Sequence, residues 1–236
     1  MFTDIHSHVI WGVDDGAENE EETFRLLEEA AADGIGEIIC TPHMTPGVYD
    51  FPTDAFTEHF RQAEDYIQSK GLPLALYTGA EILYTDQTPR LLKEHRIPTL
   101  AGTRYVLIEF SPTDTLAHIR DALQKTYAAG FHPVIAHMER YPAIAKTEQV
   151  RELKERYHAL IQINARTLTR KPPLFHRRFF DSLFEENLAD FIATDTHSMP
   201  GRGTCMTAGM QALRSRYGEK AAERIEQKQK MFTQKG

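Results

Sequence analysis

The chain has 236 residues, of which 41% are hydrophobic and 26% charged, a composition typical of soluble globular domains. A net charge of −7 without a basic cluster argues against DNA or RNA as a partner, because nucleic-acid binding depends on many lysine and arginine contacts to phosphate. No apolar run approaches the roughly 18 residues of a membrane span and no signal segment opens the chain, so we expect no membrane insertion and a cytoplasmic location.

Apolar segments alternate with helical patterns along the whole chain. The predicted strands are 2–5, 37–40, 74–78, 105–108, 133–136, 160–163 and 191–193. The predicted helices are 19–33, 53–70, 88–95, 116–129, 148–157, 174–187 and 204–229. This alternation predicts an α/β fold with a parallel sheet and helices outside it. Apolar strands favour a closed or nearly closed barrel, although periodicity does not exclude an open sheet. No repeat or linker divides residues 1–236, so we expect a single domain.

The first strand ends in two histidines. His6 and His8 point to the same side because side chains alternate along a strand with a period of two. Two imidazoles on one face can hold a metal ion, but they can equally be two polar residues at a strand terminus. The pair alone therefore does not decide between these interpretations.

Ligand-type side chains also follow the other predicted strands. In a parallel βα barrel the carboxyl ends of all strands meet on one face, so these side chains should gather there. Nine nitrogen and oxygen ligands without a thiolate are more than one ion needs, and they predict two or three ions: Mn²⁺, or Fe or Zn, with Mg²⁺ less suited to so many imidazoles. The predicted ligands are His6, His8, Asp14, His43, Glu81, Glu109, His137, Asp195 and His197.

These segments resemble a known superfamily. Asp-Ile-His-Ser-His at 4–8, Gly-Val-Asp-Asp-Gly-Ala at 12–17, Thr-Pro-His at 41–43, Gly-Ala-Glu at 79–81, His-Met-Glu-Arg-Tyr at 137–141 and Asp-Thr-His at 195–197 occur in order. They are similar to motifs of the polymerase-and-histidinol-phosphatase (PHP) superfamily. Within it, the chain resembles the bacterial manganese-dependent protein-tyrosine phosphatases of capsule and exopolysaccharide operons.

The resemblance implies a distorted (β/α)₇ TIM-like barrel of the PHP type with a trinuclear site. One ion would take His6, His8, Glu81 and Asp195, and a second would share Glu81 and add Glu109 and His137. A third would take Asp14, His43 and His197, and the choice between Asp14 and Asp15 stays open. The two phosphate-binding arginines of the family fall on Arg140 and Arg202. The resemblance also implies a protein substrate, the tyrosine-phosphorylated tail of a kinase that controls polysaccharide export. The sequence does not indicate an oligomeric state.

The sequence after each of the two cysteines excludes a cysteine-dependent mechanism. A cysteine-dependent tyrosine phosphatase needs an arginine six residues after its nucleophile, but Pro46 follows Cys40 and Gln211 follows Cys205 at that distance. Any phosphatase activity must therefore depend on metal ions.

Three alternatives remain open. One is a small-molecule PHP phosphatase, for example one that acts on histidinol phosphate. Another is a non-catalytic regulator that binds a phosphorylated tail and uses metal ions structurally, although structural sites are normally closed to further ligands. The third is an amidohydrolase, which also begins with His-x-His but commonly has a metal-bridging lysine where this chain has Glu109.

Overall fold

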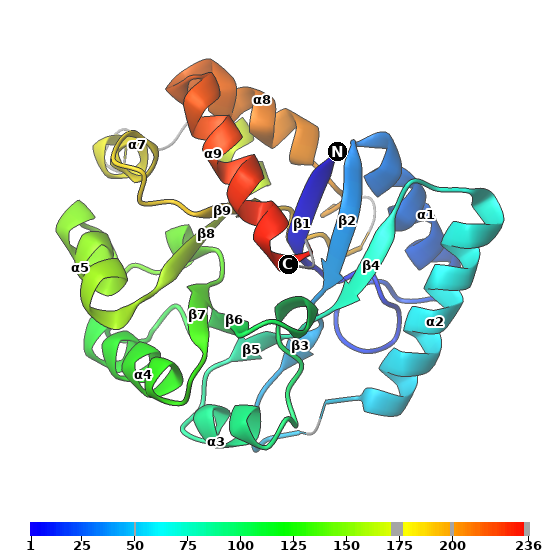
Figure 1. Ribbon diagram of the computed structural model, residues 1–236, viewed down its shortest axis with the longest axis horizontal. Coiled ribbons are helices and arrows are strands. Elements are labelled where there is room, and N and C mark those ends of the chain that lie inside the picture. Colours follow the sequence, from blue (N-terminus) through cyan, green and yellow to red (C-terminus); the bar gives the residue numbers. More distant parts are fainter. Residues whose placement is uncertain (50, 171–176, 199–200, 234–236) are drawn as a thin grey trace.

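The computed structural model describes residues 1–49, 51–170, 177–198 and 201–233. It is an α/β fold with a curled parallel sheet and helices outside it (Figure 1). The strands are β1 (Phe2–Ser7), β2 (Ile35–Cys40), β3 (His43–Met44), β4 (Ala75–Thr78), β5 (Glu81–Leu83), β6 (Tyr105–Glu109), β7 (His132–Ile135), β8 (Leu160–Asn164) and β9 (Phe191–Ala193). The α-helices are α1 (Glu20–Ala32), α2 (Thr53–Lys70), α3 (Thr88–Lys93), α4 (Leu116–Ala128), α5 (Thr147–Tyr157), α6 (Ala165–Thr169), α7 (Arg177–Glu185), α8 (Met206–Tyr217) and α9 (Glu219–Gln229). Single 3₁₀ turns are η1 (Leu100–Gly102), η2 (Met138–Arg140) and η3 (Lys230–Phe232).

The strands pair in two runs. The first run has the order β1-β2-β4 and the second β3-β5-β6-β7-β8-β9, and every pairing is parallel. The two ends of the curl meet, because Ser7 of β1 forms a parallel bridge with Thr196, just beyond β9. The amide of His8 donates to the carbonyl of Thr196 at 2.7 Å across this bridge. The curl therefore brings the first and last strands side by side.

The two runs are continuous in the chain, because β2 leads into β3 and β4 leads into β5. Pro42 lies in the first break and offers no amide hydrogen to a ladder. Gly79 lies in the second, where a β-carbon would come within 2.8 Å of the Ile39 side chain. The side chains of Ile39, Thr41 and Leu100 can pack against the chain here only because position 79 has no side chain. Both breaks stand directly before predicted ligands, His43 and Glu81, so the same irregularity turns both side chains into the site.

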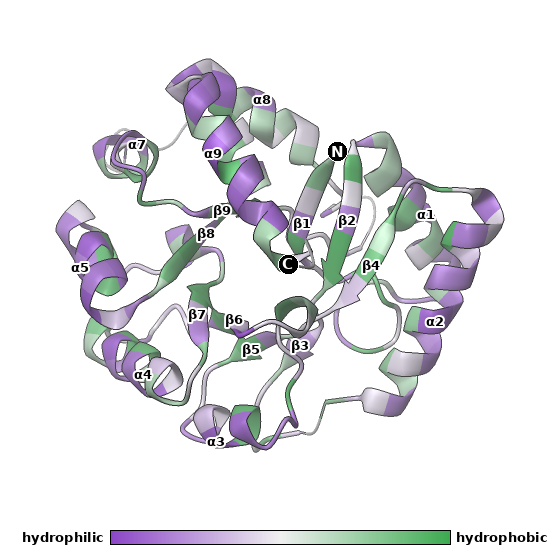
Figure 2. Cartoon of the chain, viewed as in Figure 1, coloured by the Kyte–Doolittle hydropathy of each residue, from purple (hydrophilic) through white to green (hydrophobic). Residues whose placement is uncertain are grey.

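The apolar side chains form an outer and an inner cluster. The outer cluster lies between the sheet and the helices, whose outward surfaces are largely hydrophilic (Figure 2). The inner cluster fills the curl below the predicted ligands. Its buried members are Ile5, Ile39, Leu100, Leu107, Val134, Ala136, Phe191, Ala193 and Phe232. Phe232 of η3 follows α9, and α9 contacts both β1 and β9, so α9 and η3 cover the bottom of the curl.

Each of the seven predicted strands overlaps an observed one, but one predicted helix is wrong. Residues 204–229 form two helices, α8 and α9, which are separated at Gly218. Gly218 has φ 86° and ψ 166°, a backbone conformation that no helix contains. The predicted helix 174–187 corresponds to α7, and its residues 174–176 lie outside the described residues. Within the described residues, no helix combines the length and apolar character needed to cross a membrane.

Candidate metal centre

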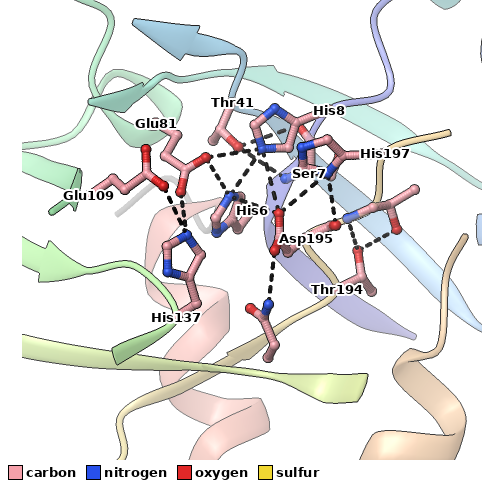
Figure 3. A network of polar contacts seen from close by, with 12 residues as sticks. His6, Ser7, His8, Thr41, Glu81, Glu109, His137, Thr194, Asp195 and His197 are labelled. Atoms are coloured by element: carbon pink, nitrogen blue, oxygen red, sulfur yellow. Dashed lines mark hydrogen bonds and ion pairs between the residues drawn. The ribbon is translucent and has the colours of Figure 1, made fainter. Parts of the chain in front are cut away.

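Ligand-type side chains that lie beside the ends of separate strands converge at the mouth of the curl, and Figure 3 shows His6, His8, Glu81, Glu109, His137, Asp195 and His197 among them. Glu81 lies at their centre and is completely buried. Its Oε2 lies 3.1 Å from His6 Nε2 and 3.2 Å from His8 Nε2. The same oxygen lies 3.1 Å from His43 Nδ1, and Oε1 lies 2.7 Å from His137 Nε2. One carboxylate thus contacts four imidazoles, the position from which it can bridge metal ions.

Three groups of ligand atoms each lie within 4.8 Å of one another. The first contains His6, His8, Glu81 and Asp195, all buried, and it is the set that the resemblance implies for one ion. The second contains His43, Glu81 and Glu109. His137 adjoins the second group, with its Nε2 3.6 Å from Glu109 Oε1. The third group contains His8, Asp15, His43 and His197.

Of the two aspartates in the first loop, the structure brings Asp15 and not Asp14 into the third group. Asp15 Oδ1 lies 3.3 Å from His43 Nε2 and 3.4 Å from His197 Nε2. Asp14 instead accepts hydrogen bonds from the amides of His43 and Gly16 and lies 2.6 Å from His8 Nδ1. The loop can fold this tightly because Gly16 has no side chain. A β-carbon at this position would lie 2.1 Å from the carbonyl oxygen of His8. The placement of Asp14 makes it a residue that orients His8.

The ring of His8 is oriented so that one nitrogen faces Asp14 and the other faces the cluster. Hydrogen bonds lower the pKa of Asp14 to about 2 despite burial, so its carboxylate accepts and His8 Nδ1 donates. A metal ion that displaces the proton on His8 Nε2 would bind the lone pair of that nitrogen. This nitrogen lies only 3.1 Å from His6 Nε2, beside the carboxylate of Glu81. Such a cluster needs positive charge between its atoms.

Buried polar atoms without a hydrogen-bond partner indicate that a metal ion supplies this positive charge. Among the described residues, Glu81 Oε2 and His197 Nε2 are buried and make no hydrogen bond. An unsatisfied buried polar atom is costly, and metal coordination is one way to satisfy it. The donor set consists of imidazole nitrogens and carboxylate oxygens, which suits Mn²⁺, Fe or Zn²⁺. The residues of this site therefore fit the group of ions that the sequence predicts.

The electrostatic environment is dominated by burial and by the carboxylates. Burial disfavours charge on His8, but the neighbouring carboxylates of Asp14 and Glu81 outweigh burial and raise its pKa to about 10. Burial, and then the repulsion of Glu81, raise the pKa of Glu109 to about 7. Burial, followed by the neighbouring His8, lowers the pKa of His197 to about 4. His8 and Glu109 therefore hold protons that a bound metal ion would displace, so metal binding should release protons.

A chain of buried amides fixes the orientation of two ligands of the first group. The backbone N–H of His137 lies 2.7 Å from Gln162 Oε1, and a backbone N–H can only donate. His6 Nδ1 lies 3.1 Å from the same oxygen, so it carries the hydrogen and leaves the lone pair on Nε2. On the other side, Gln162 Nε2 donates to Asn164 Oδ1 at 2.8 Å, and Asn164 Nδ2 donates to Asp195 Oδ2 at 2.9 Å.

Replacing Gln162 by leucine is expected to weaken metal binding by about 10- to 100-fold, the range for groups that orient metal ligands. Leucine keeps the volume but removes the acceptor that fixes the tautomer of His6 and the link to Asn164. Calorimetric titration of the purified protein with Mn²⁺ measures the change. Gln149→Leu, which alters an exposed helix cap, is the matched control. Unchanged Mn²⁺ affinity in Gln162→Leu would contradict the role assigned to Gln162.

The two predicted phosphate-binding arginines lie at the rim of the cluster. Arg140 Nη2 lies 2.6 Å and Arg202 Nη2 3.0 Å from Asp195 Oδ2. Their side chains are 44% and 41% exposed, so both can be reached from solvent. Two loops far apart in the sequence therefore direct guanidinium groups toward the same ligand. A phosphate oxygen above the first group would lie within their reach.

Two ligands have an unusual backbone. His137 has φ 29° and Asp195 has φ 54°, values that side-chain-bearing residues rarely adopt. Residues in such conformations cost of order 1–3 kcal/mol each and persist only where the surroundings hold them. The amide of His137 is held by Gln162, and that of Asp195 donates to the His6 carbonyl at 2.9 Å. This strain sets the direction of both side chains.

Neither thiol can serve as a nucleophile at neutral pH. Cys40 is completely buried, and burial raises the pKa of its thiol well above the ordinary value. Burial also raises the pKa of Cys205 to about 11. Both cysteines are free. The structure thus agrees with the exclusion of thiol chemistry.

Known proteins resemble the chain over nearly its whole length. The family model of capsular polysaccharide synthesis proteins, CpsB/CapC, matches residues 2–232. The tyrosine-protein phosphatase CpsB of Streptococcus pneumoniae is 33% identical over 229 residues, covering 94% of this chain and 93% of that protein. The tyrosine-protein phosphatase YwqE of Bacillus subtilis (strain 168) is 28% identical over 215 residues, covering 91% and 85%.

A solved structure agrees with these sequence relationships. It comes from work on YwqE from Bacillus subtilis and CpsB from Streptococcus pneumoniae, described as unique metal-dependent tyrosine phosphatases. Its TM-score with this chain is 0.87 at 27% sequence identity, and the match covers 98% of this chain and 93% of that chain. The likeness therefore includes the curl of the sheet and the loops that form its mouth.

Proposed function

Because the chain belongs to the CpsB/CapC family of capsular polysaccharide synthesis proteins, we propose that it is a metal-dependent phosphotyrosine-protein phosphatase. The observation that carries the proposal is the position of Glu81, a buried carboxylate in contact with the rings of four histidines. Two arginines stand beside this cluster, where a phosphoryl group can be bound. A metal cluster and two cationic donors together match the charge of a phosphomonoester dianion.

The proposed ligands form three groups that share members. One ion would be held by His6, His8, Glu81 and Asp195, and a second by Glu81, Glu109 and His137, with His43 close by. A third would be held by Asp15, His43 and His197. We propose Asp15 as this carboxylate because both carboxylate oxygens of Asp14 already accept hydrogen bonds. Two or three Mn²⁺ ions are the proposed occupants, and Fe or Zn remains compatible with the donors.

The bound ions and the protein side chains would have different roles in phosphate hydrolysis. Bound metal ions would lower the pKa of water toward about 7 and neutralise charge on the phosphoryl oxygens. Arg140 and Arg202 would bind phosphoryl oxygens through planar donor forks, which lysine cannot offer. Asp195 contacts both guanidinium groups and holds them in place before substrate binds. A tyrosine phenolate, with a pKa of about 10, leaves more readily than a serine alkoxide, so the site needs no strong acid for an aryl ester.

The finer fold and the partner are also part of the proposal. We propose that the curled sheet is the distorted (β/α)₇ barrel of PHP proteins, supported by the Ser7–Thr196 bridge and the parallel pairing throughout. The proposed substrate is the tyrosine-phosphorylated tail of a kinase that regulates capsule or exopolysaccharide synthesis, in the cytoplasm. Family membership supports this partner.

The expected activity is hydrolysis of p-nitrophenyl phosphate that requires Mn²⁺, stops on chelation and returns when Mn²⁺ is restored. Alkylation with iodoacetamide should leave it unchanged, because neither thiol is ionised at neutral pH. A colorimetric assay of p-nitrophenol release measures each condition. Loss of activity on alkylation, without dependence on metal, would contradict the mechanism.

Turnover of a phosphotyrosine peptide is then compared with turnover of histidinol phosphate. A preference for histidinol phosphate would favour the small-molecule alternative. Metal binding without hydrolysis of any phosphomonoester would favour the alternative of a non-catalytic regulator that binds a phosphorylated tail.

A further inference from the structure

A hollow of about 440 Å³ opens directly beside the metal groups. Asp15, His43 and Glu109 form its inner wall, and each belongs to one of the ligand groups described above. The same hollow is also lined by apolar and aromatic residues of the β1 loop, β3, β5 and the loop after β3. They are Val13, Met44, Tyr49 and Leu83. The hollow therefore combines residues of the metal groups with apolar residues that can contact an apolar group.

The loop after β3 is held in place by several contacts. The amides of Val48 and Tyr49 donate to the carbonyl of Thr45, at 3.0 and 3.3 Å, which closes a turn. The Thr45 hydroxyl donates to the Tyr49 hydroxyl oxygen at 3.2 Å. Thr85 Oγ1 donates to the carbonyl of Pro46 at 2.8 Å. Gly47 packs so closely on Gln87 that a β-carbon would come within 2.3 Å of its side chain. Tyr49 is thus presented on a fixed turn.

This turn exposes large apolar side chains. Four large hydrophobic side chains of the described residues stand out by exposure: Met1, Val48, Tyr49 and Tyr127. Val48 is 73% and Tyr49 48% exposed, and the two are adjacent in this turn, where Tyr49 lines the hollow. Apolar groups held in water next to a catalytic centre are typical of surfaces that contact a ligand.

We propose that this hollow binds the aryl ring of the phosphotyrosine residue, with Tyr49 packed against the ring and Val48 against the flanking peptide. The inference rests on the proposed phosphatase function and names the part of the site that recognises the substrate. A cavity of about 150 Å³ is enough for benzene, so a hollow of about 440 Å³ takes the ring together with part of its neighbouring residue. A phosphoserine side chain would carry no ring that contacts the apolar residues of the hollow.

A second hollow does not fit this role. It has about 490 Å³ and lies against α2, lined by Phe51, Phe56, Phe60 and Ile97 among others. None of its lining residues belongs to a metal group. Because the phosphoryl group is bound at the metal centre, its aryl ring must lie in the hollow beside the metal groups, which is the smaller of the two.

The test uses the Mn²⁺-loaded protein with Tyr49→Ala, Tyr49→Phe and the control Tyr127→Ala, an exposed tyrosine of α4. We expect Tyr49→Ala to raise the KM for a phosphotyrosine peptide about 2- to 12-fold, the range of one aromatic pair, with kcat little changed. Tyr49→Phe should retain most of the affinity, and Tyr127→Ala should behave as wild type. Calorimetric binding of a peptide with phosphonomethyl-phenylalanine should weaken by the same factor.

Inorganic phosphate separates the ring from the phosphoryl group. Its inhibition constant should be unchanged in Tyr49→Ala, because phosphate reaches only the metal ions and arginines. An equal change for phosphate and peptide, or no change for the peptide, would overturn the ring site. Absence of turnover on every aryl phosphate by the wild-type protein would instead overturn the proposed function.

Discussion

Replacing Glu81 by glutamine is expected to reduce kcat/KM for a phosphotyrosine peptide by more than about 100-fold, beyond the 10- to 100-fold cost of losing a group that only orients ligands. Glutamine has nearly the same shape but removes the charge at the point where four imidazoles meet. Its amide nitrogen would also face ring nitrogens, so two of the three proposed ligand groups would lose their shared member. The expected cause of inactivity is therefore loss of metal.

Three measurements separate this cause from misfolding. Metal content per chain should fall in Glu81→Gln, and Mn²⁺ should no longer raise the melting temperature, since a ligand stabilises only the state that binds it. Circular dichroism reports whether the fold is retained. Glu58→Gln, at an exposed carboxylate bonded to Arg61 and Gln62, is the matched control. A folded Glu81→Gln protein with full metal content and full activity would refute the bridging role.

Replacing Arg140 by alanine is expected to lower kcat by about 100- to 1,000-fold, as does the loss of one donor that stabilises charge in a transition state. Arg140 lies 2.6 Å from Asp195 and remains 44% exposed, which places its guanidinium at the edge of the metal groups rather than inside them. Metal content should therefore stay the same. Steady-state kinetics on the phosphotyrosine peptide, with metal analysis of the same sample, measures both quantities.

Two further variants define the role of Arg140. Arg140→Lys keeps the charge but not the planar fork, so it should recover only part of the lost kcat. Arg151→Ala removes an arginine of an exposed ion pair with Glu186 and should leave kcat unchanged. Loss of metal from Arg140→Ala at unchanged kcat per bound ion would show that Arg140 supports the cluster instead of the phosphoryl group.

The strands and the general position of the site could be predicted from the sequence for one physical reason. Apolar strands and helical patterns alternate regularly, and ligand-type side chains occur where strands end, as with Glu81 and His137. Parallel pairing then forces those ends together, whatever the details of each loop. The split of residues 204–229 also had a signal, because Gly218 interrupts the helical pattern, but a glycine alone does not reveal that its backbone takes a positive φ that ends the helix.

The choice between neighbouring side chains could not be predicted. Asp14 and Asp15 are the same residue type in one loop, and only the amides of Gly16 and His43 determine that Asp14 turns toward His8. Gln162 gave a signal that sequence reasoning missed, since it is a polar residue inside an otherwise apolar strand. Its partners are 156 positions away at His6 and 25 positions away at His137, so its role appears only when the sheet has curled.

The meeting of the first and last strands has a consequence for how the protein matures. His6 and His8 are synthesised near the start of the chain, whereas Asp195 and His197 follow the last strand. A nascent polypeptide that has not yet passed this point can offer only part of the first and third ligand groups. Contacts so distant along the chain also form late, because loop closure opposes them. The first and third groups can therefore be completed only after Asp195 and His197 have been synthesised, whereas the residues of the second group, His43, Glu81 and Glu109, are all present earlier.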